Sequence, residues 1–144
     1  FQIEEPHDTL SSPYYQGVFL KYVFTKGKSF ATLGAYKTTN KLDPDTMHYS
    51  EMFVFGFGQD FYSRHLGRGS KKFFNLYSGC TLGGMLASND KRKETFGYIA
   101  PAVGLEIFKN KYVLIDTKVN YMVPFKNTRQ MRGLAFNVSF NFVF

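Results

Sequence analysis

Two residues with the chemistry for nucleophilic catalysis, His48 and Ser50, lie two positions apart in the sequence. Alternate side chains of an extended strand point to the same face, so the imidazole base and the hydroxyl would lie side by side. Catalysis also needs a third group that orients the base, and a Glu or Asp on a neighbouring strand would supply it. The pair is therefore a candidate site for nucleophilic catalysis.

The strand that carries this pair argues against catalysis. His48 and Ser50 share one face with Met52, Val54 and Gly56, which we assign to the interior of the fold. A site that cleaves lipid should open toward the membrane, and only a β-bulge would turn the pair that way. We interpret the pair as an ordinary polar strand end and keep catalysis as the alternative.

The sequence gives no pattern for metal or cofactor chemistry. His7 and His65 lie in expected loops, and Cys80 is the single cysteine, which excludes an internal disulfide and a cysteine-rich metal site. The G-x-S-x-G, phosphate-loop and dinucleotide-binding motifs do not occur. We therefore expect no catalytic residue, no metal and no cofactor.

Five charged residues fall on the inward face of the predicted strands: Lys21, Asp60, Glu106, Asp116 and Lys118. Burying a single ion is costly, so we expect these ions to pair, with Glu106, Asp116, Lys118 and Lys21 in one network of salt bridges. A conducting or proton-handling lumen is the functional alternative. We favour a structural plug, because eight strands enclose an interior too narrow for an open pore.

Alternation of apolar and polar residues predicts strands throughout the chain. Seven segments show it clearly, over residues 15–25, 29–39, 48–63, 71–87, 95–108, 112–123 and 131–144. No helical period persists, and no apolar run is long enough for a transmembrane helix. Repeated strands with short turns predict one all-β domain over residues 1–144, folded as a barrel or a sandwich.

The last segment has the clearest pattern. Every second residue is large and apolar: Leu134, Phe136, Val138, Phe140, Phe142 and Phe144. The residues between them are small or polar, apart from Val143. This strand therefore has one face of large apolar side chains, which we call the oily face, and one face of small or polar side chains.

The loops alternate between short and long, which predicts an up-and-down barrel. Outer-membrane barrels have short periplasmic turns and longer outside loops. If the last strand ends in the periplasm at Phe144, alternating the loops backward along the chain makes the turns at 26–28 and 109–111 periplasmic. The segment 15–25 then starts outside, so one more strand must precede residue 15. Residues 1–5 would supply its upper end, giving eight strands. Since the chain starts at Phe1, we expect a leader to have been removed and the first strand to be short or to begin upstream.

The oily face decides between a membrane barrel and a soluble one. A soluble lipocalin-like barrel would turn this face inward around a ligand. The face carries large rings such as Phe53, Phe55 and Phe136, while the opposite face carries small residues such as Gly56 and Ala135 that suit a narrow interior. Large outside and small inside is the arrangement that lipid requires, so we predict a closed transmembrane barrel.

The formal net charge of +7 is spread over both ends of this barrel. The expected outside loops carry basic residues suited to lipopolysaccharide phosphates: Lys91, Arg92, Lys93, Arg129 and Arg132. Nucleic-acid binding would need basic residues gathered on one face, so we expect no nucleic-acid partner.

Several segments resemble known outer-membrane proteins. The ladder that ends in Phe144 resembles the signal that delivers strands to the bacterial outer-membrane assembly machinery. The whole chain resembles small OmpA/OmpX-type barrels. More specifically, "YYQGVFLKYVFTKGKSFATLGAYK", "KKFFNLYSGCTLGG" and "GLEIFKNKYVLI" resemble the TraO family of conjugal-transfer proteins of Bacteroidota, although the last strand departs from that family's ending. His48 and Ser50 resemble the His-x-Ser pair of PagL-type lipid A deacylases.

The resemblance implies a non-enzymatic outer-membrane barrel that serves as a structural or accessory subunit of a larger envelope complex, such as a conjugation or secretion machine. The implied partners are outer-membrane lipid, lipopolysaccharide and other envelope proteins. A lipid A deacylase and a soluble lipocalin-like binder remain the alternatives.

Overall fold

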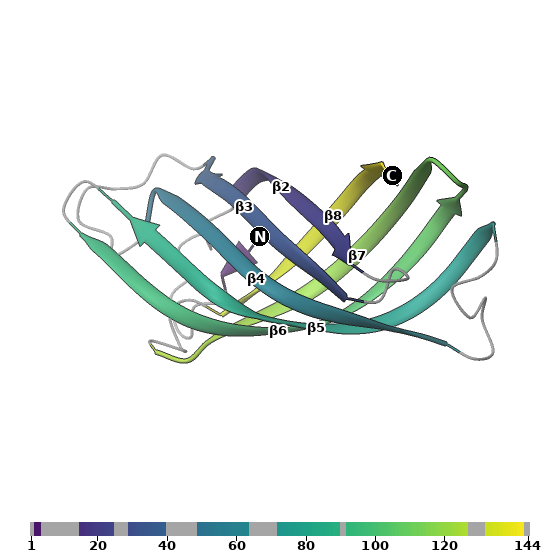
Figure 1. Cartoon of the computed structure of the whole chain (residues 1–144). Helices are drawn as coiled ribbons and strands as arrows, with labels where there is room; N and C mark the ends of the chain where they lie inside the picture. The colour runs from purple at the N-terminus through teal and green to yellow at the C-terminus, as the bar shows by residue number, and fades with distance from the viewer. Residues whose placement is uncertain are drawn as a thin grey trace.

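The computed structural model describes residues 2–3, 15–24, 29–39, 49–63, 72–89, 92–126 and 132–142. Its strands are β1 (Gln2–Ile3), β2 (Tyr15–Phe24), β3 (Ser29–Thr38), β4 (Glu51–Tyr62), β5 (Phe73–Ser88), β6 (Lys93–Lys109), β7 (Val113–Pro124) and β8 (Gly133–Phe142). They form one antiparallel sheet in the order β1-β8-β7-β6-β5-β4-β3-β2, which curls into a nearly closed barrel (Figure 1). The predicted all-β, up-and-down barrel is confirmed.

The seven long strands coincide with the seven predicted segments, and their ends differ by a few residues. The expected short first strand is also present. β1 pairs Gln2 with Leu134 and Ile3 with Gly133, and no ladder joins β2 to β8 in the described part of the chain. The sheet is therefore paired continuously from β1 to β2, and the described part of the barrel stays open between β2 and the edge formed by β1 and β8.

The up-and-down course gives the barrel two ends. We call the end where β2 begins the Tyr15 end, and β3, β5 and β7 finish there. We call the other end the Tyr62 end. β4 and β8 finish there, and β5 begins there. In the predicted topology, the Tyr15 end faces outside and the Tyr62 end faces the periplasm.

Side chains alternate between the two faces of the sheet, apart from an irregularity at Glu106–Phe108 on β6. On β4, Met52 and Val54 are buried inside, while Phe53 and Phe55 are exposed on the outside. On β8, the outward ring of Phe140 is 69% exposed, whereas Asn141 beside it is buried. Large apolar side chains therefore cover the outward face, although aromatic side chains such as Phe30 and Phe96 also fill the interior.

Two interior glycines explain how large rings fit into so narrow a barrel. A side chain added at Gly58 would collide with the ring of Phe30, and one added at Gly104 would collide with the ring of Tyr77. Both rings are almost completely buried. Small residues on the inward face therefore leave the space that the interior aromatic side chains fill.

The interior has two zones of different chemistry. Toward the Tyr15 end, a cluster of aromatic and aliphatic side chains fills the barrel: Tyr15, Tyr49, Met52, Val54, Met85, Ala87, Phe96, Tyr98, Ala100 and Met122. The hydroxyl of Tyr15 donates a hydrogen bond of 2.8 Å to the backbone carbonyl of Tyr49. Toward the Tyr62 end, the buried residues include most of the polar and charged side chains of the interior, beside the rings of Phe30 and Tyr77. The apolar zone thus blocks the interior at one end.

Candidate functional site

Two lysines and two aspartates meet inside the barrel, and we call this group the Asp60 cluster: Lys21, Asp60, Asp116 and Lys118. The ammonium group of Lys21 lies 3.0 Å from Oδ2 of Asp60 and 3.7 Å from Oδ2 of Asp116. Nζ of Lys118 lies 3.6 Å from Oδ1 of Asp60. All four side chains are buried, so these ion pairs form away from bulk water.

Aromatic side chains complete the Asp60 cluster. The ring of Phe30 contacts both lysines, with its centroid 4.5 Å from Nζ of Lys21 and 4.4 Å from Nζ of Lys118. The hydroxyl of Tyr77 donates to the carboxylate of Asp116, at 2.8 and 2.7 Å from its two oxygens. Cation–π contacts and a hydrogen bond therefore add to the ion pairs.

A second polar group, the Glu106 cluster, lies beside the first: Tyr62, Asn75, Glu106 and Lys109. Tyr62 donates its hydroxyl proton to Glu106, Asn75 donates an amide hydrogen at 3.0 Å, and Nζ of Lys109 lies 3.6 Å from the carboxylate. The rings of Tyr62 and Tyr77 are in contact, with centroids 5.6 Å apart. This contact joins the two clusters.

The predicted network differs from this arrangement in its connections. Lys21, Asp116 and Lys118 do come together, but the carboxylate between the two lysines belongs to Asp60. Glu106 lies opposite Asp116 in the β6–β7 ladder, yet its ion pair is with Lys109. Alternation had placed Asp60 inside the barrel, but nothing in the sequence shows that β2 and β4 side chains reach each other across β3.

The Asp60 cluster is balanced in charge, with two cationic and two anionic side chains. Such a group neutralises itself and leaves no net charge to attract an ion into the interior. No group of His, Cys, Asp or Glu side chains in the described ranges could hold a metal ion. The arrangement therefore suits a structural role, in which buried ions on separate strands hold the barrel in one shape.

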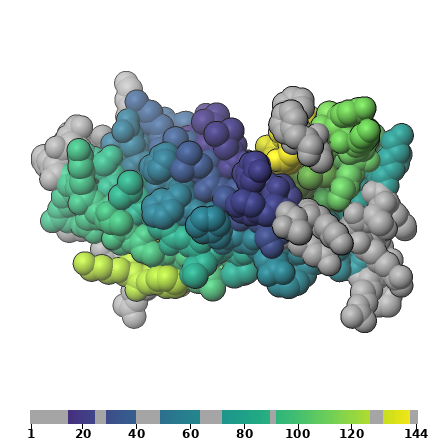
Figure 2. Space-filling model, in the orientation of Figure 1, coloured from purple at the N-terminus to yellow at the C-terminus, as the bar shows by residue number. Residues whose placement is uncertain are grey.

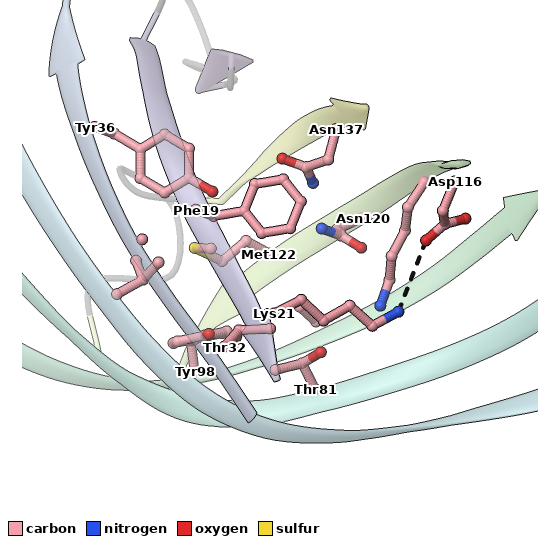
Figure 3. Close-up of a pocket in the computed structure, with 14 residues that line it drawn as sticks. Phe19, Lys21, Thr32, Tyr36, Thr81, Tyr98, Asp116, Asn120, Met122 and Asn137 are labelled. Carbon is pink, nitrogen blue, oxygen red and sulfur yellow. Dashed lines mark ion pairs between the residues drawn. The ribbon is translucent and has the colours of Figure 1, made fainter. Parts of the chain in front are cut away.

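A small cavity lies between the charged and the apolar zones. Its volume is about 50 Å³, and its lining includes Lys21, Asp116, Asn120 and Asn137, which Figure 3 shows converging on one space. Pockets for small molecules measure roughly 300–1,000 Å³. The cavity is thus far too small for the ligand of a lipocalin-like carrier.

The outward face is apolar on every long strand. Large side chains exposed there include Val18, Leu20, Leu33, Phe55, Phe57, Leu82, Val103, Val119, Phe136, Val138 and Phe140. Figure 2 shows one side of this surface as closely packed side chains over β2, β3 and β4. A continuous apolar face of this extent is unusual for a monomer in water.

The remaining predicted residues divide between described and undescribed parts of the chain. Arg92 and Lys93 are exposed and Arg132 is half-buried, all at the Tyr15 end, as the predicted topology required. Four other predicted residues lie outside the described residues: Lys91, Arg129, His48 and Phe144. Phe142 ends β8, and its side chain also lies outside the described part of the chain.

Ser50 of the candidate catalytic pair has a structural partner. Its hydroxyl donates to the backbone carbonyl of Ser88 at 3.1 Å, and the backbone amide of Ser50 donates to the same oxygen at 2.9 Å. Ser50 directly precedes β4, so these bonds extend the β4–β5 pairing by one residue before the start of β4. The hydroxyl therefore works as part of the strand end in this structure.

Comparisons with protein-family models, with curated proteins and with solved structures find no match to the chain. No helix in the described part is long and apolar enough to cross a membrane.

Proposed function

We propose that this protein is an outer-membrane β-barrel that acts, without catalysis, as a structural or accessory subunit of a larger cell-envelope complex. The observation that carries the proposal is the polarity of the barrel. Phe57 and Phe136 are 68% and 67% exposed on the outward face, while the ions of the Asp60 cluster are buried inside. Lipid favours this arrangement, because a curled sheet pairs its backbone internally and presents apolar side chains.

A filled interior supports a structural subunit over a channel. The apolar cluster occupies the Tyr15 end, and the balanced Asp60 cluster occupies the middle of the barrel. The cavity between them measures about 50 Å³. Small eight-stranded barrels of the OmpA/OmpX type have interiors of this size, which side chains fill. The resemblance of several segments to TraO proteins suggests a conjugation or secretion machine as the larger complex.

The basic residues at the Tyr15 end fit the same proposal. Arg92, Lys93 and Arg132, together with Lys91 and Arg129, would meet the phosphates of lipopolysaccharide outside the membrane. Several cations at one end of the barrel attract phosphate together. Salt screens this attraction, so the affinity for phosphate should fall as the salt concentration rises.

The membrane assignment is tested by fractionation and by folding into vesicles. The full-length protein should sediment with outer membranes, resist carbonate extraction and migrate differently on gels before and after boiling. Mixed with vesicles, it should insert without raising their conductance. A protein that stays in the soluble fraction would disprove the membrane assignment, and discrete single-channel openings would disprove the filled interior.

The subunit assignment needs a separate experiment. Native membranes would be solubilised in mild detergent, and the tagged full-length protein would be purified with whatever binds to it. We expect other envelope proteins to co-purify in fixed ratio and to survive a salt wash. Recovery of the barrel alone, after chemical crosslinking in intact cells, would contradict a role in a larger complex.

A further inference from the structure

Two neighbouring rows of outward-facing residues cross the sheet near the Tyr15 end. The strand pairings align the first row as Val18, Ala35, Phe53, Leu86 and Thr95. The second row, one step nearer the end, is Gln16, Lys37, Glu51, Ser88 and Lys93. The outer surface thus changes from apolar to charged within a single step along five strands.

A groove follows these two rows. Its volume is about 660 Å³, within the range of roughly 300–1,000 Å³ that is typical of ligand pockets. Ala35 is the smallest side chain of the apolar row, and its ladder neighbours are the larger Val18 and Phe53. The groove therefore has an apolar part suited to a hydrocarbon chain and a charged rim suited to a polar headgroup.

The charges that face outward on the rim are mainly cationic. Lys37 forms an ion pair with Glu51 at 3.9 Å, but both side chains are well exposed and such pairs are weak. Lys93 is exposed on β6, one position from Glu94. Glu94 acts on the opposite face, beside Tyr49 of the interior apolar cluster. Burial is the main cause that raises the pKa of Tyr49, and the carboxylate of Glu94 raises it further. Lys93 is exposed, so its ammonium group can contact an external anion.

We infer that this groove binds one molecule of a phosphate-bearing lipid, with an acyl chain over Ala35 and separate phosphate groups at Lys37 and Lys93. The inference rests on the proposed membrane function. In the proposed topology the groove lies in the outer leaflet, so the lipid is the lipid A part of lipopolysaccharide. Charge complementarity and the match between the groove and the polar boundary both favour this occupant.

The test uses purified lipid A as the probe and the full-length protein folded into mild detergent. Native mass spectrometry would count bound lipid A, and a titration would give its affinity. Ala35→Phe fills the groove. Ala31→Phe, on the same strand and the same face but outside the groove, is the matched control. We expect wild type and Ala31→Phe to bind alike and Ala35→Phe to bind about tenfold more weakly.

Further measurements compare lipid A with phosphatidylglycerol and separate a failure to bind lipid from a failure to fold or insert. Lys93→Glu should weaken binding as well, and Ala35→Leu replaces Ala35→Phe if the phenylalanine prevents folding. Equal binding by the groove variants and wild type would overturn the inference, as would equal affinity for phosphatidylglycerol and lipid A. A wild-type protein that inserts into vesicles but binds no lipid A defeats this inference alone. A protein that never inserts defeats the proposed function.

Discussion

Asp60 on β4 and Lys21 on β2 form an ion pair of 3.0 Å although β3 lies between their strands in the sheet. The two side chains meet in the interior because the sheet curls strongly and both point inward. Asp60 also lies near Lys118 on β7, so one carboxylate connects strands from different sides of the barrel. The Asp60 cluster is therefore a cross-brace between strands that share no backbone hydrogen bonds.

Removing one cation should destabilise this cross-brace. Lys118→Met leaves two buried aspartates with Lys21 alone, at an expected cost of about 3–5 kcal/mol if the ions stay buried. The measurement is the temperature at which the folded form disappears in a heat-shift gel. Combining Lys118→Met with Asp60→Asn restores one cation to one anion, so the double variant should be more stable than the Lys118→Met single variant. Independent, additive losses would show that the two side chains do not interact.

A charge on the outward face should be costly only in lipid. Phe57 lies in the middle of the apolar face, and Phe57→Lys should destabilise a membrane barrel by about 2–4 kcal/mol. Phe125→Lys is the matched control, because Phe125 is equally exposed but lies beyond the end of β7. Unfolding from vesicles by denaturant would compare the two. Equal stability of both variants would favour a soluble barrel.

The last residue should matter for assembly more than for the finished fold. Deletion of Phe144 removes the end of the apolar ladder that resembles an assembly signal, so less protein should reach the outer membrane and more should be degraded. Refolding of the same deletion in detergent should remain nearly normal. Full insertion in cells would show that this residue is no part of a targeting signal.

The candidate catalytic pair should be dispensable for lipid chemistry. Ser50→Ala loses the hydrogen bond to the Ser88 carbonyl, which contributes about 1 kcal/mol at a strand end. His48→Ala should likewise leave the lipid A of the cell unchanged in a mass spectrum. Removing one member of a true catalytic pair usually lowers the rate by several orders of magnitude. Lipid A that changes with Ser50 would establish an enzyme.

The sequence by itself determined which residues face which way. Strand side chains alternate with a period of two, so the position of one large ring fixes the face of the other residues on that strand until a β-bulge interrupts it, as between Glu106 and Phe108 on β6. The alternation alone therefore assigns Phe136 and Asn137 to opposite faces, and it assigns Asp60 to the interior in the same way. Short turns between successive strands determined the up-and-down order by an equally local rule.

Only the tertiary structure decided which inward residues meet. Contacts across the interior depend on how the strands are staggered and how tightly the sheet curls, and neither quantity is encoded in a period of two. Neighbouring strands suggested Glu106 as a partner for the Asp116 and Lys118 group, but the curl brought Asp60 to the lysines and left Glu106 with Lys109. The rows that form the outer groove depend on the same stagger, because each row combines residues from five strands.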